Sequence, residues 1–410
     1  MQLRCYLEYQ ADRVEAVLAA HRTPGRVTGG SVGPRVIRFF VQPAPHVRFA
    51  SIKRLGDDLA LALRTSTLRI SRGREGVILE FSNPEPHSLS LLPLLRNLPP
   101  LPVGTAVLGL QTDGVPLLAQ LAAPEVAHIL IAGTTGSGKS VLLRTATATL
   151  LLGNAPRTLV AVLIDPKGRT FPAQFHCPHL LRPVITDPTA ATAVLQSLVQ
   201  LMEQRDANHE CLPRVVVVID ELSEVVLQGP GITAPLTRLA QRGREAGIHL
   251  LVATQRPSAA ILSGLIRANF PLRLVGRVVS PEDARIAAGR GGTHAHLLTG
   301  RGDFLAVTGE RVVRFQAALI TAAELQAAIG TSVPLRLPLE LPAVPQVTLE
   351  TQPEEDDIVR LAQRLAPWWA EHGGTWGAKT GALRFLFGGA VPVGGSYWRL
   401  TEAAIALLEK

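Results

Sequence analysis

The segment at residues 133–140 constrains the fold of this chain more than any other feature. Its sequence, GTTGSGKS, fits the pattern G-x-x-x-x-G-K-[ST] without a mismatch. The glycines allow backbone N–H groups to converge on phosphate groups. An apolar run precedes the segment at residues 128–131, and a helical pattern follows it at residues 139–152. This strand–loop–helix context predicts a phosphate loop in an α/β nucleotide-binding domain, rather than a fortuitous glycine turn.

The phosphate loop carries specific chemical expectations. Lys139 is expected to neutralise the β- and γ-phosphates of ATP, and the Ser140 hydroxyl to ligate Mg²⁺. The helix that begins here adds its N-terminal dipole. The predicted nucleotide-binding residues are Gly133, Thr134, Thr135, Gly136, Ser137, Gly138, Lys139, Ser140 and Val141. The predicted cofactors are therefore ATP and Mg²⁺.

Two carboxylates follow a second apolar strand. The run VVVVI at residues 215–219 ends in Asp220 and Glu221. We expect Asp220 to hold Mg²⁺ and Glu221 to polarise the attacking water, because ligand sites of α/β sheets lie at the carboxyl ends of the strands. The alternative is an acid pair that opens the next helix.

Two further strands end in polar residues. Gln255 follows the strand at residues 249–253 and is predicted to sense the γ-phosphate or orient the water; the alternative is a loop amide that caps a helix. Asp165 and Lys167 follow the strand at residues 159–164. They either shape the nucleotide site or pair with each other in a surface turn.

Strands alternate with helices from residue 103 to 332, and the central strands are almost wholly apolar. This pattern predicts an α/β domain with a mostly parallel sheet and helices on both faces. Residues 1–88 form a small N-terminal α+β domain, and residues 89–102 a Pro-rich connector. Residues 333–353 are a Pro-rich linker. All four tryptophans lie within residues 354–410, which predicts a folded C-terminal domain rather than a disordered tail.

Bulk composition narrows the class of protein. The net charge is +8, carried almost entirely by Arg, which favours a polyanionic partner; a GC-rich genome is the competing explanation. Three widely spaced cysteines indicate a reduced, cytoplasmic protein. No run of about 18 apolar residues is present, so we expect no membrane insertion.

Several blocks resemble the FtsK/SpoIIIE family of DNA translocases. They include the phosphate loop, IDPK at residues 164–167, RGREAGIHLLVATQRPS at residues 242–258 and GRGDFL at residues 300–305. VGPRVIRF at residues 32–39 and DDLALAL at residues 57–63 resemble the α-domain of the family. The similar blocks span roughly residues 10–320, in the family's order.

The resemblance implies a RecA-like motor core, joined to an α-domain, that threads double-stranded DNA through a homohexameric ring. By its position in SPEDAR at residues 280–285, Arg285 resembles the finger that acts on the neighbouring subunit's nucleotide. Arg238, Arg242, Arg244 and Arg273 are other candidates. The loops at residues 290–294 and 228–231 either touch DNA phosphates or are ordinary surface loops.

The tail does not clearly match the family. Helices are predicted at residues 354–371 and 376–387, and a hairpin at residues 391–400. This order suits a winged-helix DNA contact; the alternative is a domain that docks a protein partner. For the whole chain, the alternatives to a DNA motor are a secretion-type ATPase that moves proteins and a non-motor ring gated by nucleotide.

Overall fold

The structure is a computed structural model, and it describes most of the chain. The described residues are 2–66, 68–73, 76–229, 231–255, 268–309 and 311–329, with 339, 341, 342 and three short strands near the C-terminus. The chain divides into two compact units, residues 1–342 and 343–410. No helix among the described residues combines the length and apolar character needed to cross a membrane.

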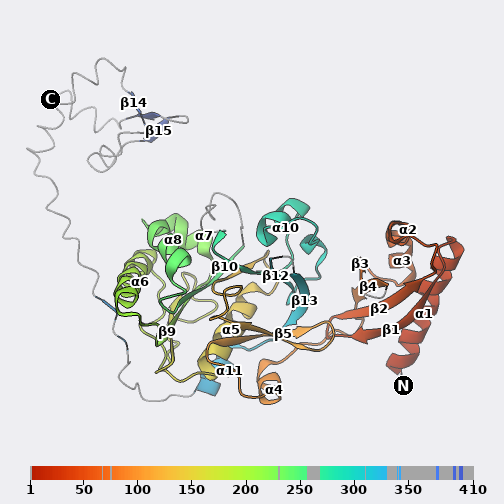
Figure 1. The fold of residues 1–410 in the computed structure, drawn as a ribbon, viewed down its shortest axis with the longest axis horizontal. Helices are drawn as coiled ribbons and strands as arrows, with labels where there is room; N and C mark the ends of the chain where they lie inside the picture. Colours follow the sequence, from red (N-terminus) through yellow and green to blue (C-terminus); the bar gives the residue numbers. More distant parts are fainter. Residues whose placement is uncertain are drawn as a thin grey trace, which may run out of the picture. The chain divides into compact units, whose positions relative to one another are not determined.

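The N-terminal part of the first unit is an antiparallel sheet with helices packed on it (Figure 1). The strand order is β1-β2-β4-β3. Alternate residues of the strands, such as Ile37, Phe39 and Leu79, are buried with Leu18 and Leu59 of the helices, as expected for a sheet with one covered face. The elements are α1 (Gln2–Ala20), β1 (Gly25–Val32), β2 (Val36–Pro43), α2 (Phe49–Arg54), α3 (Gly56–Ala62), β3 (Leu68–Arg72) and β4 (Val77–Ser82).

The rest of the first unit is built around a nine-stranded mixed sheet. Its strand order is β6-β5-β13-β12-β11-β7-β10-β9-β8. The strands β8, β9, β10, β7 and β11 are parallel, as the sequence predicts. The strands β12, β13, β5 and β6 extend the sheet in antiparallel pairings that the apolar pattern did not reveal. Their bounds are β5 (Thr105–Gln111), β6 (Pro116–Gln120), β7 (Ile129–Ala132), β8 (Leu159–Ile164), β9 (Arg214–Ile219), β10 (Ile248–Thr254), β11 (Leu272–Val275), β12 (Asp303–Thr308) and β13 (Arg311–Ala317).

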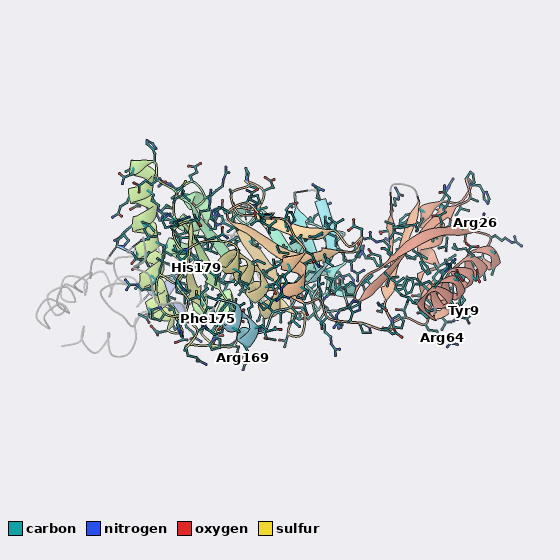
Figure 2. All side chains as sticks on the ribbon, turned by 90° about the horizontal axis from the view of Figure 1, so that it is seen from below. Tyr9, Arg26, Arg64, Arg169, Phe175 and His179 are labelled. Carbon is teal, nitrogen blue, oxygen red and sulfur yellow. The ribbon has the colours of Figure 1, made fainter. Side chains whose placement is uncertain are left out.

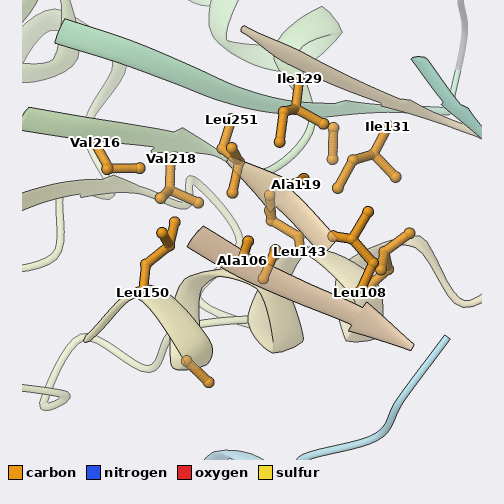
Figure 3. Close-up of a cluster of buried hydrophobic side chains, with 14 of the residues drawn as sticks. Ala106, Leu108, Ala119, Ile129, Ile131, Leu143, Leu150, Val216, Val218 and Leu251 are labelled. Atoms are coloured by element: carbon orange, nitrogen blue, oxygen red, sulfur yellow. The ribbon is translucent and has the colours of Figure 1, made fainter. Parts of the chain in front are cut away.

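Helices cover both faces of this sheet. On one face α5 (Lys139–Leu152) packs on residues such as Val216 and Val218 (Figure 3), and α11 (Ala322–Ile329) packs on α5. The intervening side chains, Val215 and Val217, face α6 (Pro188–Asn208), α7 (Leu222–Gln228) and α8 (Thr233–Arg242). Both sides of the central strands are therefore buried, which explains their unbroken apolar sequence.

Two helices show how local sequence sets their ends. The Asp187 carboxylate caps α6 by accepting from the Ala190 N–H at 2.7 Å, and Ser280 caps α10 (Pro281–Ala288) by accepting from the Asp283 N–H at 3.0 Å. Both helices begin with proline, which suits the first helical position. The 3₁₀ helix η1 (Ala295–Leu297) follows α10.

A buried ionic cluster joins the two sheets of the first unit. Arg314 on β13 donates to Glu80 on β4 at 2.8 Å. Its other nitrogens make a forked contact with the Asp303 carboxylate at 2.8 and 2.9 Å. Arg38 adds a second bond to Glu80 at 2.9 Å. Arg69 also lies 3.8 Å from Glu80. This junction cluster (Glu80, Asp303, Arg314, Arg38 and Arg69) thus pairs two carboxylates with three guanidinium groups, in a geometry that favours strong pairing.

The predicted connectors are not plain coil where they are described. The Pro-rich connector contains a short helix, α4 (Leu91–Arg96). It tolerates Pro93 because the third helical position needs no intrahelical N–H bond. In the predicted linker, Leu339 and Leu341 pack against the apolar core under α6 and α8.

The second unit contains a three-stranded sheet, with β14 (Thr375–Gly377), β16 (Tyr397–Arg399) and β15 (Val391–Val393) in that order. The antiparallel pair β15–β16 confirms the predicted hairpin. The helix predicted at residues 376–387 is wrong at its start, because Trp376 pairs with Trp398 across the sheet. The rest of that helix, and the one predicted at residues 354–371, lie outside the described residues.

Candidate nucleotide site

The phosphate loop begins where β7 ends and leads into α5. Gly136 and Gly138 have φ values of 81° and 100°, which disfavour any residue with a Cβ atom. A Cβ atom on Gly138 would also lie 2.7 Å from the Gly302 nitrogen. The motif's glycines are therefore required both by the path of the loop and by a neighbouring segment.

The neighbouring segment at residues 301–302 forms backbone hydrogen bonds with the phosphate loop. The N–H groups of Arg301 and Gly302 donate to the carbonyls of Gly136 and Ser137 at 2.9 and 2.7 Å. On the other side, the Arg277 carbonyl accepts from the Thr134 N–H at 2.8 Å. The backbone of the loop is thus held by segments that follow β11 and precede β12.

Lys139 is the first residue of α5 and is buried, with 5% of its surface exposed. Burial lowers the pKa of its ammonium group, and the nearby carboxylates of Glu221 and Asp220 only partly offset this. A desolvated cation at a helix N-terminus gains strongly from an anionic ligand. The environment of Lys139 therefore suits a phosphate group. Ser140 and Val141 continue the first turn of the same helix.

Asp220 ends up beside the phosphate loop, as the sequence predicts. The Ser140 hydroxyl lies 3.3 and 3.4 Å from its two carboxylate oxygens. Burial raises the pKa of Asp220, while a 2.6 Å hydrogen bond from Thr170 lowers it, and the net shift is upward. A hydroxyl and a carboxylate are the oxygen donors that Mg²⁺ prefers. These two residues fit the predicted metal.

Glu221 adopts a left-handed conformation, with φ 61°. This conformation costs a non-glycine residue free energy and is typical of functional sites. Its carboxylate accepts the Gln255 N–H at 3.1 Å and the Thr254 hydroxyl at 3.3 Å, and the Ser223 hydroxyl also donates to it. Glu221 occupies the N-cap position of α7, but its side chain makes no capping hydrogen bond there and is held toward the end of β10.

Gln255 connects the phosphate loop to the acidic residues. Strand β10 lies between β7 and β9, which confirms the expectation that it neighbours the Asp220 strand. The Thr135 hydroxyl donates to the Gln255 side-chain oxygen at 3.0 Å, while the backbone N–H of the same residue binds Glu221. Gln255 thus contacts both motifs, and its role as a γ-phosphate sensor stays a prediction.

Asp165 and Lys167 do not pair through their side chains. The Lys167 ammonium lies 2.6 Å from the Glu224 carboxylate on α7. Asp165 instead accepts three backbone N–H groups, from Lys167, Thr170 and Phe171. Of the two alternatives left open by the sequence, the ion pair between these two residues is wrong, and Asp165 shapes the loop that lies beside Asp220.

Three of the candidate arginines form ion pairs with residues outside the nucleotide site. Arg285 on α10 is more than half exposed and pairs with Glu282 at 2.6 Å. Arg238 and Arg242 on α8 form ion pairs with Glu203 and Asp206 of α6. The finger role of Arg285 stays a prediction.

The predicted DNA loops also stay predictions. The loop at residues 290–294 is partly anchored, because Arg290 donates to the Gly309 carbonyl at 3.3 Å. The other loop, at residues 228–231, joins α7 to α8.

Sequence reasoning missed the hydroxyl groups that orient the acids, namely those of Thr170, Ser223 and Thr254. Thr254 directly precedes Gln255 and Ser223 lies two residues after Glu221, so proximity to a motif was an available signal. Thr170 had no such signal, because its contact with Asp220 depends on how the loop after β8 folds.

Comparison with known proteins agrees with this site. The family profile described as FtsK/SpoIIIE family matches residues 101–209 and 204–259, and that of the FtsK alpha domain matches residues 3–83. The chain belongs to the FtsK/SpoIIIE family. The match includes the phosphate loop, both acidic residues and Gln255, so the family assignment rests on the site as well as on the N-terminal sheet.

Relatives in the FtsK/SpoIIIE family are similar over most of this chain. The chain is 33% identical to the DNA translocase SpoIIIE of Bacillus subtilis over 85% of its length and 48% of the relative's. It is 33% identical to the DNA translocase FtsK of Listeria monocytogenes over 78% of this chain and 46% of that one. This family member thus spans about half the length of these relatives.

Two solved structures show the same fold as this FtsK/SpoIIIE family member. The conjugation coupling protein TcpA of pCW3, in a monomer form with ATPγS, is 24% identical, with a TM-score of 0.53 over 77% of this chain and 96% of that one. The cytoplasmic domain of the Type VII secretion ATPase EccC of Thermomonospora curvata is also 24% identical, with a TM-score of 0.52 over 62% and 36%. At this identity the likeness concerns the fold alone.

Proposed function

We propose that this chain is an ATP-driven motor that moves double-stranded DNA as a homohexameric ring. One observation carries the proposal: a continuous set of contacts links the phosphate loop to the acidic residues and Gln255. Thr135 binds Gln255, Gln255 binds Glu221, and Ser140 lies against Asp220. These are the parts that phosphoryl transfer to water requires.

Each residue has a proposed role. Lys139 and the backbone of the phosphate loop bind the β- and γ-phosphates, and Ser140 and Asp220 hold Mg²⁺, which neutralises charge on the phosphates when bound. Glu221 accepts a proton from the attacking water, because the donors around its carboxylate aim it toward the end of β10. Gln255 orients that water or senses the γ-phosphate.

The DNA substrate rests on the family and on charge. The relatives that match are named DNA translocases, and the net charge of +8 favours a polyanion. In the proposed ring, Arg285 reaches the nucleotide of the neighbouring subunit, since its exposed ion pair with Glu282 is easily exchanged.

The proposed domain boundaries follow the sequence prediction. Residues 1–88 form the α-domain, 103–332 the motor domain and 354–410 a winged-helix-like or protein-docking domain, joined by the segments 89–102 and 333–353. A cytoplasmic location remains part of the proposal, on the basis of the reduced cysteines.

The test is the steady-state ATPase rate with and without long linear double-stranded DNA, in wild type and Lys139→Ala. We expect stimulation by DNA that weakens at high salt, because phosphate contacts release counterions. Lys139→Ala should lower the rate by at least about 10²-fold. It should still bind DNA in an anisotropy assay, which controls for folding.

Two results would oppose this function. A high ATPase rate that does not change when DNA is added would favour a motor that moves proteins. A single turnover with no steady state would favour a non-motor ring gated by nucleotide.

A further inference from the structure

The segment between Asp165 and Phe171 is folded around a single carboxylate. Asp165 is 1% exposed and accepts the N–H groups of Lys167, Thr170 and Phe171 at 3.1, 2.8 and 2.9 Å. Three donors satisfy most of the acceptor capacity of one carboxylate. Asp165 is thus occupied in shaping this segment, and the segment has a defined path at the carboxyl end of β8.

The helix of the phosphate loop holds the same segment from the other side. Arg144 on α5 donates from its Nε to the Thr170 carbonyl at 3.0 Å and from an Nη to the Arg169 carbonyl at 3.3 Å. Arg169, labelled in Figure 2, lies on this segment between β8 and α6. Both backbone polar groups of Thr170 are therefore bonded, its N–H to Asp165 and its carbonyl to Arg144.

The Thr170 side chain points from this anchored backbone to Asp220. Thr170 is fully buried, and its hydroxyl donates to one Asp220 oxygen, Oδ2, at 2.6 Å. This length is typical of a strong O–H···O⁻ bond. Among the described residues, the Ser140 hydroxyl is the other side chain hydrogen-bonded to Asp220, at 3.3 and 3.4 Å. The short bond therefore defines the orientation of the carboxylate more tightly than the long ones.

We propose that Thr170 is a positioning residue for the metal ligand Asp220. It restricts rotation of the carboxylate about its Cβ–Cγ bond, so that Asp220 keeps the orientation in which it meets Ser140. Mg²⁺ demands near-ideal octahedral geometry, so a ligand that is free to rotate binds it less well. This inference rests on the proposed role of Asp220 in holding Mg²⁺.

Thr170→Val tests the inference because it removes the hydroxyl and keeps the shape. The full chain is titrated with Mg²⁺ at a fixed concentration of a fluorescent ATP analogue, and nucleotide binding is also measured in EDTA. We expect Thr170→Val to need about 10-fold more Mg²⁺ for half of the Mg²⁺-dependent gain in nucleotide affinity, the low end of losses caused by removing support for a metal ligand. Binding in EDTA should be unchanged, and Thr170→Ser should stay within about twofold of wild type.

Thr147→Val is the matched control. Thr147 is also buried, at 1% exposure, but its hydroxyl only bonds the Leu143 carbonyl within α5. The control should not shift the Mg²⁺ midpoint. If Thr170→Val does not fold, Thr170→Ala takes its place with the same expected shift.

Asp220→Ala separates the two proposals. If Asp220→Ala shifts the Mg²⁺ midpoint but Thr170→Val does not, the positioning role of Thr170 is wrong and the metal role of Asp220 stands. If neither shifts it, the metal role of Asp220 itself fails. A Thr170→Val loss of equal size in EDTA and in Mg²⁺ would show a purely structural hydroxyl and would also overturn the inference.

Discussion

Two buried clusters of charge lie in the first unit of this chain, and they are satisfied in opposite ways. In the junction cluster, every carboxylate meets a guanidinium group: Arg314 binds Glu80 and Asp303 at 2.8 Å. At the nucleotide site, Asp220 and Glu221 meet hydroxyl and backbone N–H groups instead. In the first cluster guanidinium groups bond the carboxylates directly, whereas in the second Lys139 is near Asp220 and Glu221 without a direct ion pair among the described residues.

The pKa shifts follow this difference. Burial alone would raise the pKa of Glu80, but the positive charges of Arg314 and Arg69 outweigh burial and lower it. Burial raises the pKa of Asp220, and the Thr170 hydrogen bond does not cancel that effect. Similar burial thus gives shifts of opposite sign, depending on whether a cation bonds the carboxylate directly.

The charges of the junction cluster therefore serve stability, and those of the nucleotide site are available for ligand binding. A buried cluster whose carboxylates are all directly ion-paired holds two sheets together. Removal of any member is expected to lower the stability of the fold. A cluster whose carboxylates are not directly ion-paired costs stability by itself and is better satisfied when a further cation binds. Each of the substitutions below changes one of these two groups of carboxylates or a matched control, and the measured change in stability shows whether the carboxylate stabilises the fold.

The largest expected effect is on Arg314. Arg314→Met leaves Glu80 and Asp303 buried without their cation, and we expect it to lower the free energy of unfolding by about 3–5 kcal/mol. Urea denaturation of the full chain measures this loss. Arg311→Met, on the same strand but exposed, is the control and should change stability by less than about 0.5 kcal/mol. A loss below about 1 kcal/mol for Arg314→Met would mean that the junction cluster does not hold the sheets together.

A smaller effect concerns Glu80 and pH. Its folded pKa lies below the ordinary value of 4.5, so its charge stabilises the fold above that value, and the contribution is lost as pH falls through the folded pKa. We expect Glu80→Gln to be less stable than wild type by about 1–3 kcal/mol at pH 7. The gap should narrow once the pH falls below about 4.5.

The exposed residue Glu125 provides the control for this pH series. Glu125→Gln should track wild type at every pH. A gap between Glu80→Gln and wild type that stays constant from pH 7 to pH 3.5 would show that the charge of Glu80 contributes nothing.

The smallest effect has the opposite sign and concerns Asp220. Asp220→Asn removes a buried charge whose attraction to Lys139 does not offset its burial, so we expect the nucleotide-free protein to gain about 1 kcal/mol of stability. Asp165→Asn is the matched comparison, because that carboxylate accepts three backbone N–H groups and its loss should destabilise. Thermal unfolding without nucleotide measures both. Destabilisation of similar size in the two variants would erase the distinction between the clusters.

The sequence predicted the nucleotide site better than the junction cluster, for a physical reason. The phosphate loop, Asp220, Glu221 and Gln255 each follow an apolar strand, and parallel strands bring their carboxyl ends to one edge. Local pattern therefore placed them together without knowledge of the strand order. Glu80, Asp303 and Arg314 lie on three strands from two sheets, and nothing in their local sequence indicates that they meet.

The sequence pattern did not predict the antiparallel half of the large sheet, for a similar reason. Strand β13 carries Arg311, Arg314 and Gln316 among its apolar residues, so it lacks the unbroken apolar run of β9. Its partner β12 is adjacent in sequence, but its other partner, β5, is distant, and that pairing is decided by tertiary contacts. Thr170 was missed because a loop, rather than a periodic element, brings its hydroxyl to Asp220.

The most direct test of the account is displacement of a third strand bound as a triplex at one end of linear double-stranded DNA. We predict that wild type displaces it in an ATP-dependent reaction. Glu221→Gln should bind ATP and DNA but displace the strand at least about 10²-fold more slowly, because it lacks the proton acceptor. ATP hydrolysis by wild type at a DNA-stimulated rate, without any displacement, would contradict the claim that this chain moves DNA.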